Sequence, residues 1–245
     1  MTIINTLAGF SLAFLHTVQQ RGWKRALILW AFISFISVAF ESMGVLTGVI
    51  YGSYHYTDLL GFKLFNLVPL LIPIAWFMVL APALVMSETI LADLPLSGFA
   101  KNISIAALGA LIMTAWDVTM DPIMVKAGHW VWDVKGAFFG IPLQNYWGWW
   151  LTSFVALSLS LTLFGKLSTA ATRIEQPLPL HMLLMYAVTG LGTVISAFMI
   201  GLPGPAWIGL GCMSVWVIWT AIVLLRRTAF AGKSGSEPGV IQDGI

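Results

Sequence analysis

Charged side chains are scarce in this sequence: Asp, Glu, Lys and Arg make up 9% of its 245 residues. Soluble globular domains carry about 25% charged residues, so this shortage excludes an ordinary water-soluble fold. The hydrophobic fraction of 59% and the mean hydropathy of +0.90 instead indicate an integral membrane protein. The formal net charge of +2 gives no strongly basic surface, so no nucleic-acid partner is expected.

Cysteine and the common cofactor motifs are also missing or nearly so. Cys212 is the single cysteine, which excludes an intrachain disulfide, and its apolar surroundings indicate a packing role. Neither HxxxH nor HExxH spacing occurs among the four histidines, so no metal site is expected. The sequence has no Walker loop, no GxGxxG after a strand, and no lysine in the last apolar segment for a retinal Schiff base. We therefore expect a protein that works without a cofactor.

Apolar segments of about 20 residues, the length that crosses the hydrocarbon core as a helix, recur along the whole chain. The candidate spans are Ile3–Val18, Ala26–Ile50, Leu67–Met86, Ile103–Met120, Trp147–Phe164, Leu180–Ile200 and Trp207–Leu225. The first is short, and it lacks the charged start and the cleavage site of a signal peptide, so we interpret it as a retained span. We predict one all-α, polytopic transmembrane bundle of about seven spans over residues 1–230. Residues 231–245 are polar and are expected to form a disordered cytoplasmic tail.

The positions of lysine and arginine predict the orientation of this bundle. Seven spans put three basic residues, Lys63, Lys126 and Lys135, on one side of the membrane. The opposite side receives nine: Arg21, Lys24, Arg25, Lys101, Lys166, Arg173, Arg226, Arg227 and Lys233. Cytoplasmic loops carry the excess of basic residues, so we expect an external N-terminus and a cytoplasmic C-terminus in the plasma membrane.

Three carboxylates lie in or beside the apolar segments: Glu41 in the second span, and Asp117 and Asp121 at the outer end of the fourth. An ionised carboxylate near the bilayer centre costs roughly 2.5–3.5 kcal/mol on insertion scales, so such groups are candidates for function. Asp117 and Asp121 share a helix face, and Pro122 predicts that the helix ends near Asp121. Desolvation, the neighbouring like charge and the helix dipole favour a protonated acid, which can donate a proton to a poor base.

Structural roles for the same carboxylates stay open at this point. The two aspartates can cap the helix end or pair with Lys126 and Lys135. Glu41 can be a proton partner, an acceptor for a substrate hydroxyl, or a structural acid hydrogen-bonded to another helix.

Aromatic residues are dense on the expected outer side, and most are interpreted as an interfacial belt. They are Trp116, Trp130, Trp132, Phe138, Phe139, Tyr146, Trp147, Trp149 and Trp150. The functional interpretation is a slot for a long apolar polyene, whose ring faces stabilise a developing carbocation. Trp116, next to Asp117, is the best single candidate. His55 and His129 are candidates for ordering water near the carboxylates.

Nine segments between residues 44 and 152 resemble, in order, the CruF-type carotenoid 1,2-hydratase family of membrane proteins. They are Tyr51–Thr57, Leu60–Phe65, Val68–Pro73, Trp76–Met78, Ala115–Pro122, Met124–Val125, Gly128–Trp132, Phe139–Pro142 and Asn145–Trp149. The other spans are similar only in hydropathy. The sequence departs from the family pattern at Leu80–Pro82, where an aromatic residue before proline is more usual, and at Val49–Ile50, where Pro-Phe is common.

The resemblance implies cofactor-independent addition of water across the terminal 1,2 double bond of an acyclic or monocyclic carotenoid, giving a tertiary 1-hydroxy end. The chemistry of such a hydration assigns Asp117 as the expected acid and Asp121 as its pKa partner or water-orienting group, with exchangeable roles, and Glu41 is a further catalytic candidate. The expected substrate-binding residues are Trp116, Tyr54, His55, Trp76, His129, Trp130, Trp132 and Asn145. The partners expected are this carotenoid, the lipid bilayer and other enzymes of carotenoid biosynthesis.

Two other classes of protein remain open. An intramembrane prenyltransferase also acts on isoprenoids, and the spacing of Asp117 and Asp121 superficially resembles a magnesium-diphosphate motif. That class lacks support from a second aspartate cluster, and its activity requires magnesium. A non-catalytic carotenoid-binding or transport protein is the other alternative.

The topology predicts that Lys126 and Gly232 lie on opposite sides of the membrane. Cysteine introduced at Lys126 should react with an impermeant thiol reagent added to intact cells, whereas cysteine at Gly232 should react only after the membrane is opened. Labelling of both positions from one side would overturn the topology.

Overall fold

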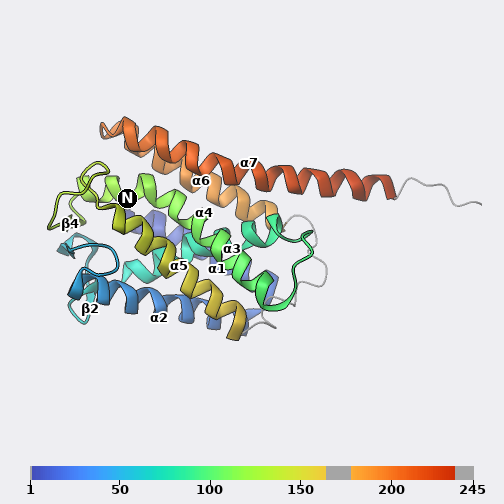
Figure 1. The fold of residues 1–245 in the computed structure, drawn as a ribbon, viewed down its shortest axis with the longest axis horizontal. Coiled ribbons are helices and arrows are strands. Elements are labelled where there is room, and N and C mark those ends of the chain that lie inside the picture. Colours follow the sequence, from blue (N-terminus) through green and yellow to red (C-terminus); the bar gives the residue numbers. More distant parts are fainter. Residues whose placement is uncertain (1, 164–177, 235–245) are drawn as a thin grey trace, which may run out of the picture.

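A computed structural model describes residues 2–163 and 178–234, and these residues form seven long α-helices that run back and forth along one axis (Figure 1). The helices are α1 (Thr2–Arg21), α2 (Trp23–Thr47), α3 (Leu71–Ile90), α4 (Gly98–Lys126), α5 (Leu143–Leu163), α6 (Leu178–Met199) and α7 (Pro203–Ser234). The predicted all-α membrane bundle is confirmed.

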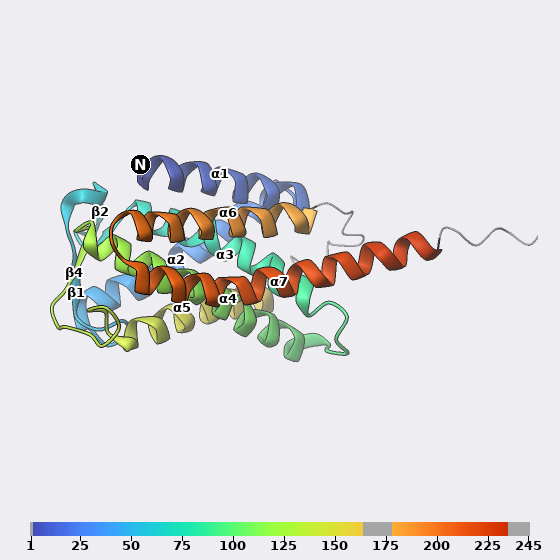
Figure 2. The same ribbon diagram turned by 90° about the horizontal axis from the view of Figure 1, so that it is seen from above.

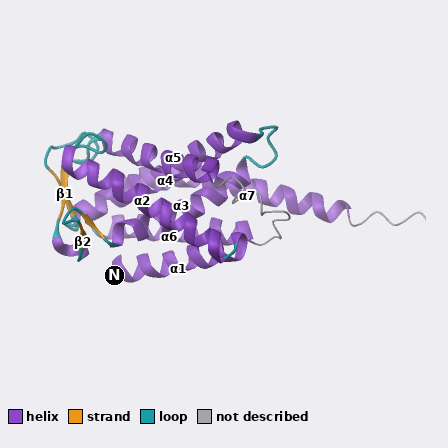
Figure 3. Ribbon diagram, turned by 90° about the horizontal axis from the view of Figure 1, so that it is seen from below, coloured by secondary structure: helices purple, strands orange, loops and turns teal. Residues whose placement is uncertain are grey.

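Five of the helices, α2, α3, α4, α6 and α7, are long and apolar enough to cross a membrane. The other two, α1 with 20 residues and α5 with 21, lie lengthwise beside them (Figure 3). Helix α3 is the central element, because almost all of its side chains are buried between its neighbours. The count of seven spans stays a prediction for α1 and α5.

Two predicted boundaries need correction. Helix α4 does not end near Asp121 but continues through Pro122 to Lys126. Asp121 is buried and hydrogen-bonded to β4 and α5, and this packing outweighs the local preference of a residue before proline. Helix α7 continues to Ser234, past the predicted start of the tail at residue 231. The rest of that tail, residues 235–245, lies outside the described residues.

The described basic residues separate between the two ends of the bundle as predicted. Helix α1 ends at Arg21, which forms a largely buried ion pair with Glu88 of α3 at 2.7 Å. At the same end, Arg227 of α7 pairs at 2.9 Å with Asp93, which follows α3. Lys63, Lys126 and Lys135 belong to the segments at the other end. Lys166 and Arg173 lie outside the described residues, and which end faces the cytoplasm stays a prediction.

Short strands gather at the end of the bundle where α2 and α4 finish (Figure 2). Strand β1 (Tyr54–Tyr56) pairs antiparallel with β4 (Trp130–Trp132), and β2 (Lys63–Leu64) pairs with β3 (Val68–Pro69). A 3₁₀ turn, η1 (Asp58–Leu60), separates β1 from β2. The inward side chains of the β1–β4 ribbon cover one end of the bundle.

The ring of Tyr51 packs between two glycines, Gly44 on α2 and Gly148 on α5. The ring is 1% exposed, and its hydroxyl is 2.7 Å from Oγ1 of Thr152, one turn further along α5. A methyl group on either glycine would overlap the ring, so both helices need glycine here to hold Tyr51 between them. This contact fixes the segment that leads into β1.

Gly148→Ala should therefore destabilise the protein by about 1–3 kcal/mol, because the added Cβ would overlap the Tyr51 ring and lie 2.6 Å from the carbonyl oxygen of Ile50. Thermal unfolding in detergent measures the effect. Gly192→Ala in α6 is the matched control, since open space surrounds its Cβ position. Equal unfolding temperatures for the two variants would contradict the packing argument.

Candidate active site

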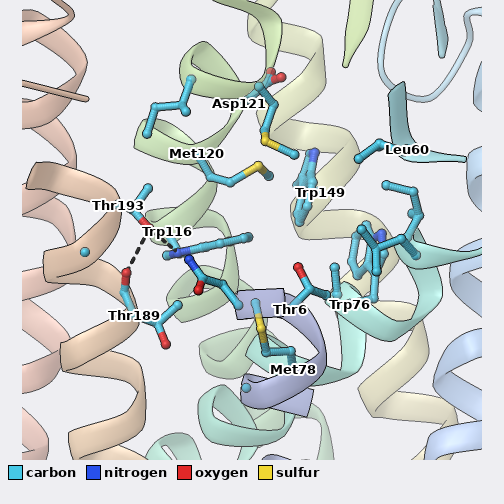
Figure 4. A pocket seen from close by; sticks show the side chains of 18 of the residues that line it. Thr6, Leu60, Trp76, Met78, Trp116, Met120, Asp121, Trp149, Thr189 and Thr193 are labelled. Carbon is cyan, nitrogen blue, oxygen red and sulfur yellow. Dashed lines mark hydrogen bonds between the residues drawn. The ribbon is translucent and has the colours of Figure 1, made fainter. Parts of the chain in front are cut away.

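A cavity of about 810 Å³ lies inside the bundle beneath the β1–β4 ribbon. Its wall takes residues from the first six helices and from both strands of the ribbon. Most of the wall is apolar or aromatic, and two carboxyl side chains, Glu41 and Asp121, reach it from α2 and α4. Figure 4 shows Asp121 above the rings of Trp116 and Trp149. The volume lies within the range of small-molecule sites.

Asp117 and Asp121 form a buried pair joined by one amide. Asn145 of α5 donates from Nδ2 to Asp117 Oδ2 at 3.1 Å and to Asp121 Oδ2 at 2.8 Å. Trp130 of β4 donates from Nε1 to the other oxygen of Asp121 at 2.6 Å. Both aspartates are buried, but of the two Asp121 lines the cavity and Asp117 does not. The Oδ1 atom of Asp117 has no hydrogen-bond partner among the described residues.

Glu41 is also buried, at 3% exposure, and three neutral donors hold it. The hydroxyls of Tyr54 and Tyr56 both donate to Oε2, the latter at 2.8 Å, and Trp76 Nε1 donates to Oε1 at 3.1 Å. The site therefore holds Glu41 from the ribbon and from α3 at once. The bond to Trp76 matches one of the interpretations left open, an acid hydrogen-bonded to another helix.

None of the ion pairs among the described residues includes these three carboxyl groups. Asp117 and Asp121 therefore do not form ion pairs with Lys126 or Lys135, which was one of the structural roles left open. The helix-capping alternative fails too, because Asp117 and Asp121 lie within α4 rather than at its end. Neutral N–H and O–H groups take the place of cations throughout the site.

Three tryptophans form one continuous aromatic wall. Trp76 of α3 and Trp149 of α5 are stacked, with ring centroids 4.4 Å apart, and Trp116 of α4 meets Trp149 edge-on at 6.5 Å. Trp116 is fixed by a 3.1 Å hydrogen bond from Nε1 to Oγ1 of Thr193. Trp149, interpreted from sequence as a belt residue, is thus a cavity residue. The sequence could have predicted this, because Trp149 follows Asn145, an expected site residue, by four positions and so shares its face of α5.

The β1–β4 register decides which ribbon side chains reach the cavity. Tyr54 pairs with Trp132 and Tyr56 with Trp130, and all four line the cavity. Alternate strand residues point to opposite faces, so His55 points away and is exposed. Its Nδ1 is 2.9 Å from Asp133, and the hydrogen bonds from Ser53 and His55 lower the pKa of that carboxyl.

The expectation that His55 and His129 face the substrate therefore needs correction. His55 lies on the outer side of the ribbon, and His129 is half-buried just before β4 without reaching the cavity wall. Burial lowers the pKa of His129. Tyr56 lines the cavity where His55 was expected. The alternation in Tyr54-His55-Tyr56 could have predicted this, because residues two apart in a strand share a face.

These features define a class of protein: a membrane helix bundle with a large apolar cavity, closed at one end by hydrogen-bonded carboxyl groups. The comparisons with known proteins agree with that class. Residues 1–216 match the family described as carotenoid biosynthesis protein, and the chain belongs to this family. No solved structure matches the chain.

A curated relative is bisanhydrobacterioruberin hydratase from Haloarcula japonica. It is 31% identical over 136 residues, which cover 56% of this chain and 45% of the relative. The matched part is thus less than half the length of that relative. The family and the relative together support a carotenoid-modifying role in the membrane.

Proposed function

We propose that this protein adds water across the terminal 1,2 double bond of an acyclic carotenoid end group, giving a tertiary 1-hydroxy carotenoid. The observation that carries the proposal is the arrangement of the cavity, in which one member of a buried aspartate pair faces a wall of stacked tryptophans. An apolar polyene fits such a wall. Hydration of an alkene starts with transfer of a proton to the double bond, and Asp121 supplies a carboxyl group in the cavity wall that can donate one.

The reaction consists of two proton transfers around one C–O bond formation. The alkene π electrons take a proton from the acid at C2, which leaves a tertiary cation at C1. Water attacks C1 and then loses a proton to a base. The base then returns its proton to the acid, so the balance is one alkene and one water in and one tertiary alcohol out, and no oxidant or reductant is needed.

Asp121 is the proposed proton donor, because it lines the cavity and Asp117 does not. This exchanges the roles first expected for the two residues. Two buried carboxyls that share one donor nitrogen repel each other when both are ionised, which favours retention of one proton on the pair. Asn145 holds the two groups in register, and Trp130 fixes the direction of Asp121.

Glu41 is the proposed proton acceptor for the attacking water. Three donors stabilise its carboxylate form, so it can remain an anion without a cation beside it. An anion on the cavity wall also favours the cation at C1. The faces of Trp149, Trp76 and Trp116 add cation–π stabilisation of about 0.5–2 kcal/mol.

The two alternative classes are less well supported. A prenyltransferase must hold a diphosphate, yet no Lys or Arg is among the described residues that line the cavity. A carotenoid-binding or transport protein needs the apolar wall but does not require an aspartate pair at its end, and burying such a pair in the membrane costs free energy.

The reaction predicts the source of the new oxygen atom. Purified protein given an acyclic carotene such as lycopene in oxygen-18 water, without molecular oxygen, nucleotide or added metal, should form a product 20 mass units heavier, by addition of one labelled water. Mass spectrometry of the extracted pigment measures it. Label that comes instead from oxygen gas would make the protein a hydroxylase, and a requirement for magnesium would favour the prenyltransferase.

The proton-donor assignment predicts that Asp121→Asn lowers turnover by about 10²–10⁴-fold, the usual contribution of general acid catalysis. Asp117→Asn and Glu41→Gln should lower turnover less, because the group facing the alkene remains. Asp133→Asn is the matched control, an exposed aspartate on the outer side of the ribbon, and should keep full activity. Folded protein is checked by its thermal transition. Near-normal turnover by Asp121→Asn, with loss in Asp117→Asn, would return the donor role to Asp117.

A further inference from the structure

The cavity is not sealed on the side where α1 and α6 lie next to each other. Figures 2 and 3 show these two helices side by side on one face of the bundle. Several residues that line the cavity here are also exposed at the surface: Leu12 of α1 at 61%, and Leu184 and Val188 of α6 at 51% and 69%. A residue that borders both the cavity and the surface marks an opening. This opening faces sideways, where the hydrocarbon of the bilayer surrounds the helices.

The far end of the cavity offers no such exit. The ribbon covers it with Tyr54, Tyr56, Trp130 and Trp132, of which the first three are buried and the fourth is partly so. Their polar atoms are engaged with Glu41 and Asp121 in three of the four cases. A long molecule whose end touches the carboxyl groups can therefore continue only toward the gap between α1 and α6.

The length of the cavity wall and its lack of basic residues indicate what kind of molecule the cavity binds. The wall follows α6 from His181 to Ser196, which is about 22 Å at the helical rise of ~1.5 Å per residue. That is most of the ~30 Å thickness of the hydrocarbon core. With no Lys or Arg among the described lining residues, an anionic lipid headgroup or diphosphate has no cation to bind. The fitting occupant is a long, uncharged, apolar chain.

We infer that the gap between α1 and α6 is a lateral portal, through which a polyene enters from the bilayer and through which its unreacted part remains outside during turnover. This rests on the proposed function for the identity of the chain. The wall encloses the end group next to Asp121 and Glu41 and the part of the chain that follows it, and the other end of the polyene lies beyond the wall. The protein therefore does not select the group at the other end of the polyene.

Gly192 provides a direct way to block the portal. It lies on α6 in the cavity wall, and open space surrounds the position of a Cβ atom there. Gly192→Phe should thus place a ring in the opening without displacing its neighbours, and it removes a glycine from a helix interior. Gly211→Phe in α7 is the matched control, because it also has open space at its Cβ position and lies away from the cavity.

The test measures binding and turnover of lycopene by the purified protein in lipid nanodiscs. Binding is the polyene absorbance retained with the protein, and turnover is the hydrated product. Gly192→Phe should lower both by at least ten-fold, whereas Gly211→Phe should stay within two-fold of the parent. Loss in both variants, or in neither, would overturn the portal.

A second measurement tests the far end of the substrate. Two carotenoids with the same acyclic end, one with a ring and one with an acyclic group at the other end, should react at rates within about three-fold. A preference above a hundred-fold would contradict the portal. If the parent protein binds lycopene without hydrating it, and Gly192→Phe weakens that binding, the portal stands and the proposed reaction falls. If Gly192→Phe hydrates lycopene as fast as the parent protein does, the proposed reaction stands and the portal falls.

Discussion

The structure depends on neutral hydrogen-bond donors holding buried carboxyl groups where no cation is present. Asn145 joins Asp117 to Asp121, Trp130 holds Asp121 from the ribbon, and the donors around Glu41 come from β1 and α3. In the proposed mechanism, a salt bridge at these positions would hold the carboxyl groups ionised and prevent them from donating a proton. Neutral donors orient the same groups while leaving their protons available. The same bonds tie α2, α3, α4 and α5 to the ribbon, so the polar network also joins the helices at this end.

The apolar and polar parts of the cavity divide the work of such a site. Stacked tryptophans provide a rigid surface for an extended chain, and the carboxyl groups stand where that surface ends. In the proposed mechanism, water is required at only one position, between Glu41 and the reacting end group. The ribbon over this position would limit the water that reaches the cation and so favour its capture over elimination or rearrangement. In the proposed mechanism, the protein contributes position and charge.

Hydropathy predicted the helices well, because a bilayer demands long apolar segments whatever their packing. The three carboxylates and Trp116 also stood out, since charge within such a segment is rare. Local rules failed at Pro122, where packing of Asp121 overrides the preference of the residue before proline. They failed again at His55, because the direction of its side chain depends on the pairing of β1 with β4, in which its partner Val131 is 76 positions away. The sequence did not predict which aspartate lines the cavity, because that depends on how α4 is rotated against α5. The shared helix face of Asp117 and Asp121 does not specify this rotation.

The alternation of the β1–β4 ribbon has one more consequence. A slip of one residue in either strand would turn its inward side chains outward and bring His55 or Val131 in their place. Glu41 would lose both tyrosine donors in one case, and Asp121 its tryptophan donor in the other. Each strand thus supplies the donors of a different carboxyl group, and the register between the strands sets both groups together. The ribbon is only three residue pairs long, but a bundle with mispaired strands would lack the hydrogen bonds that hold the proposed acid and base.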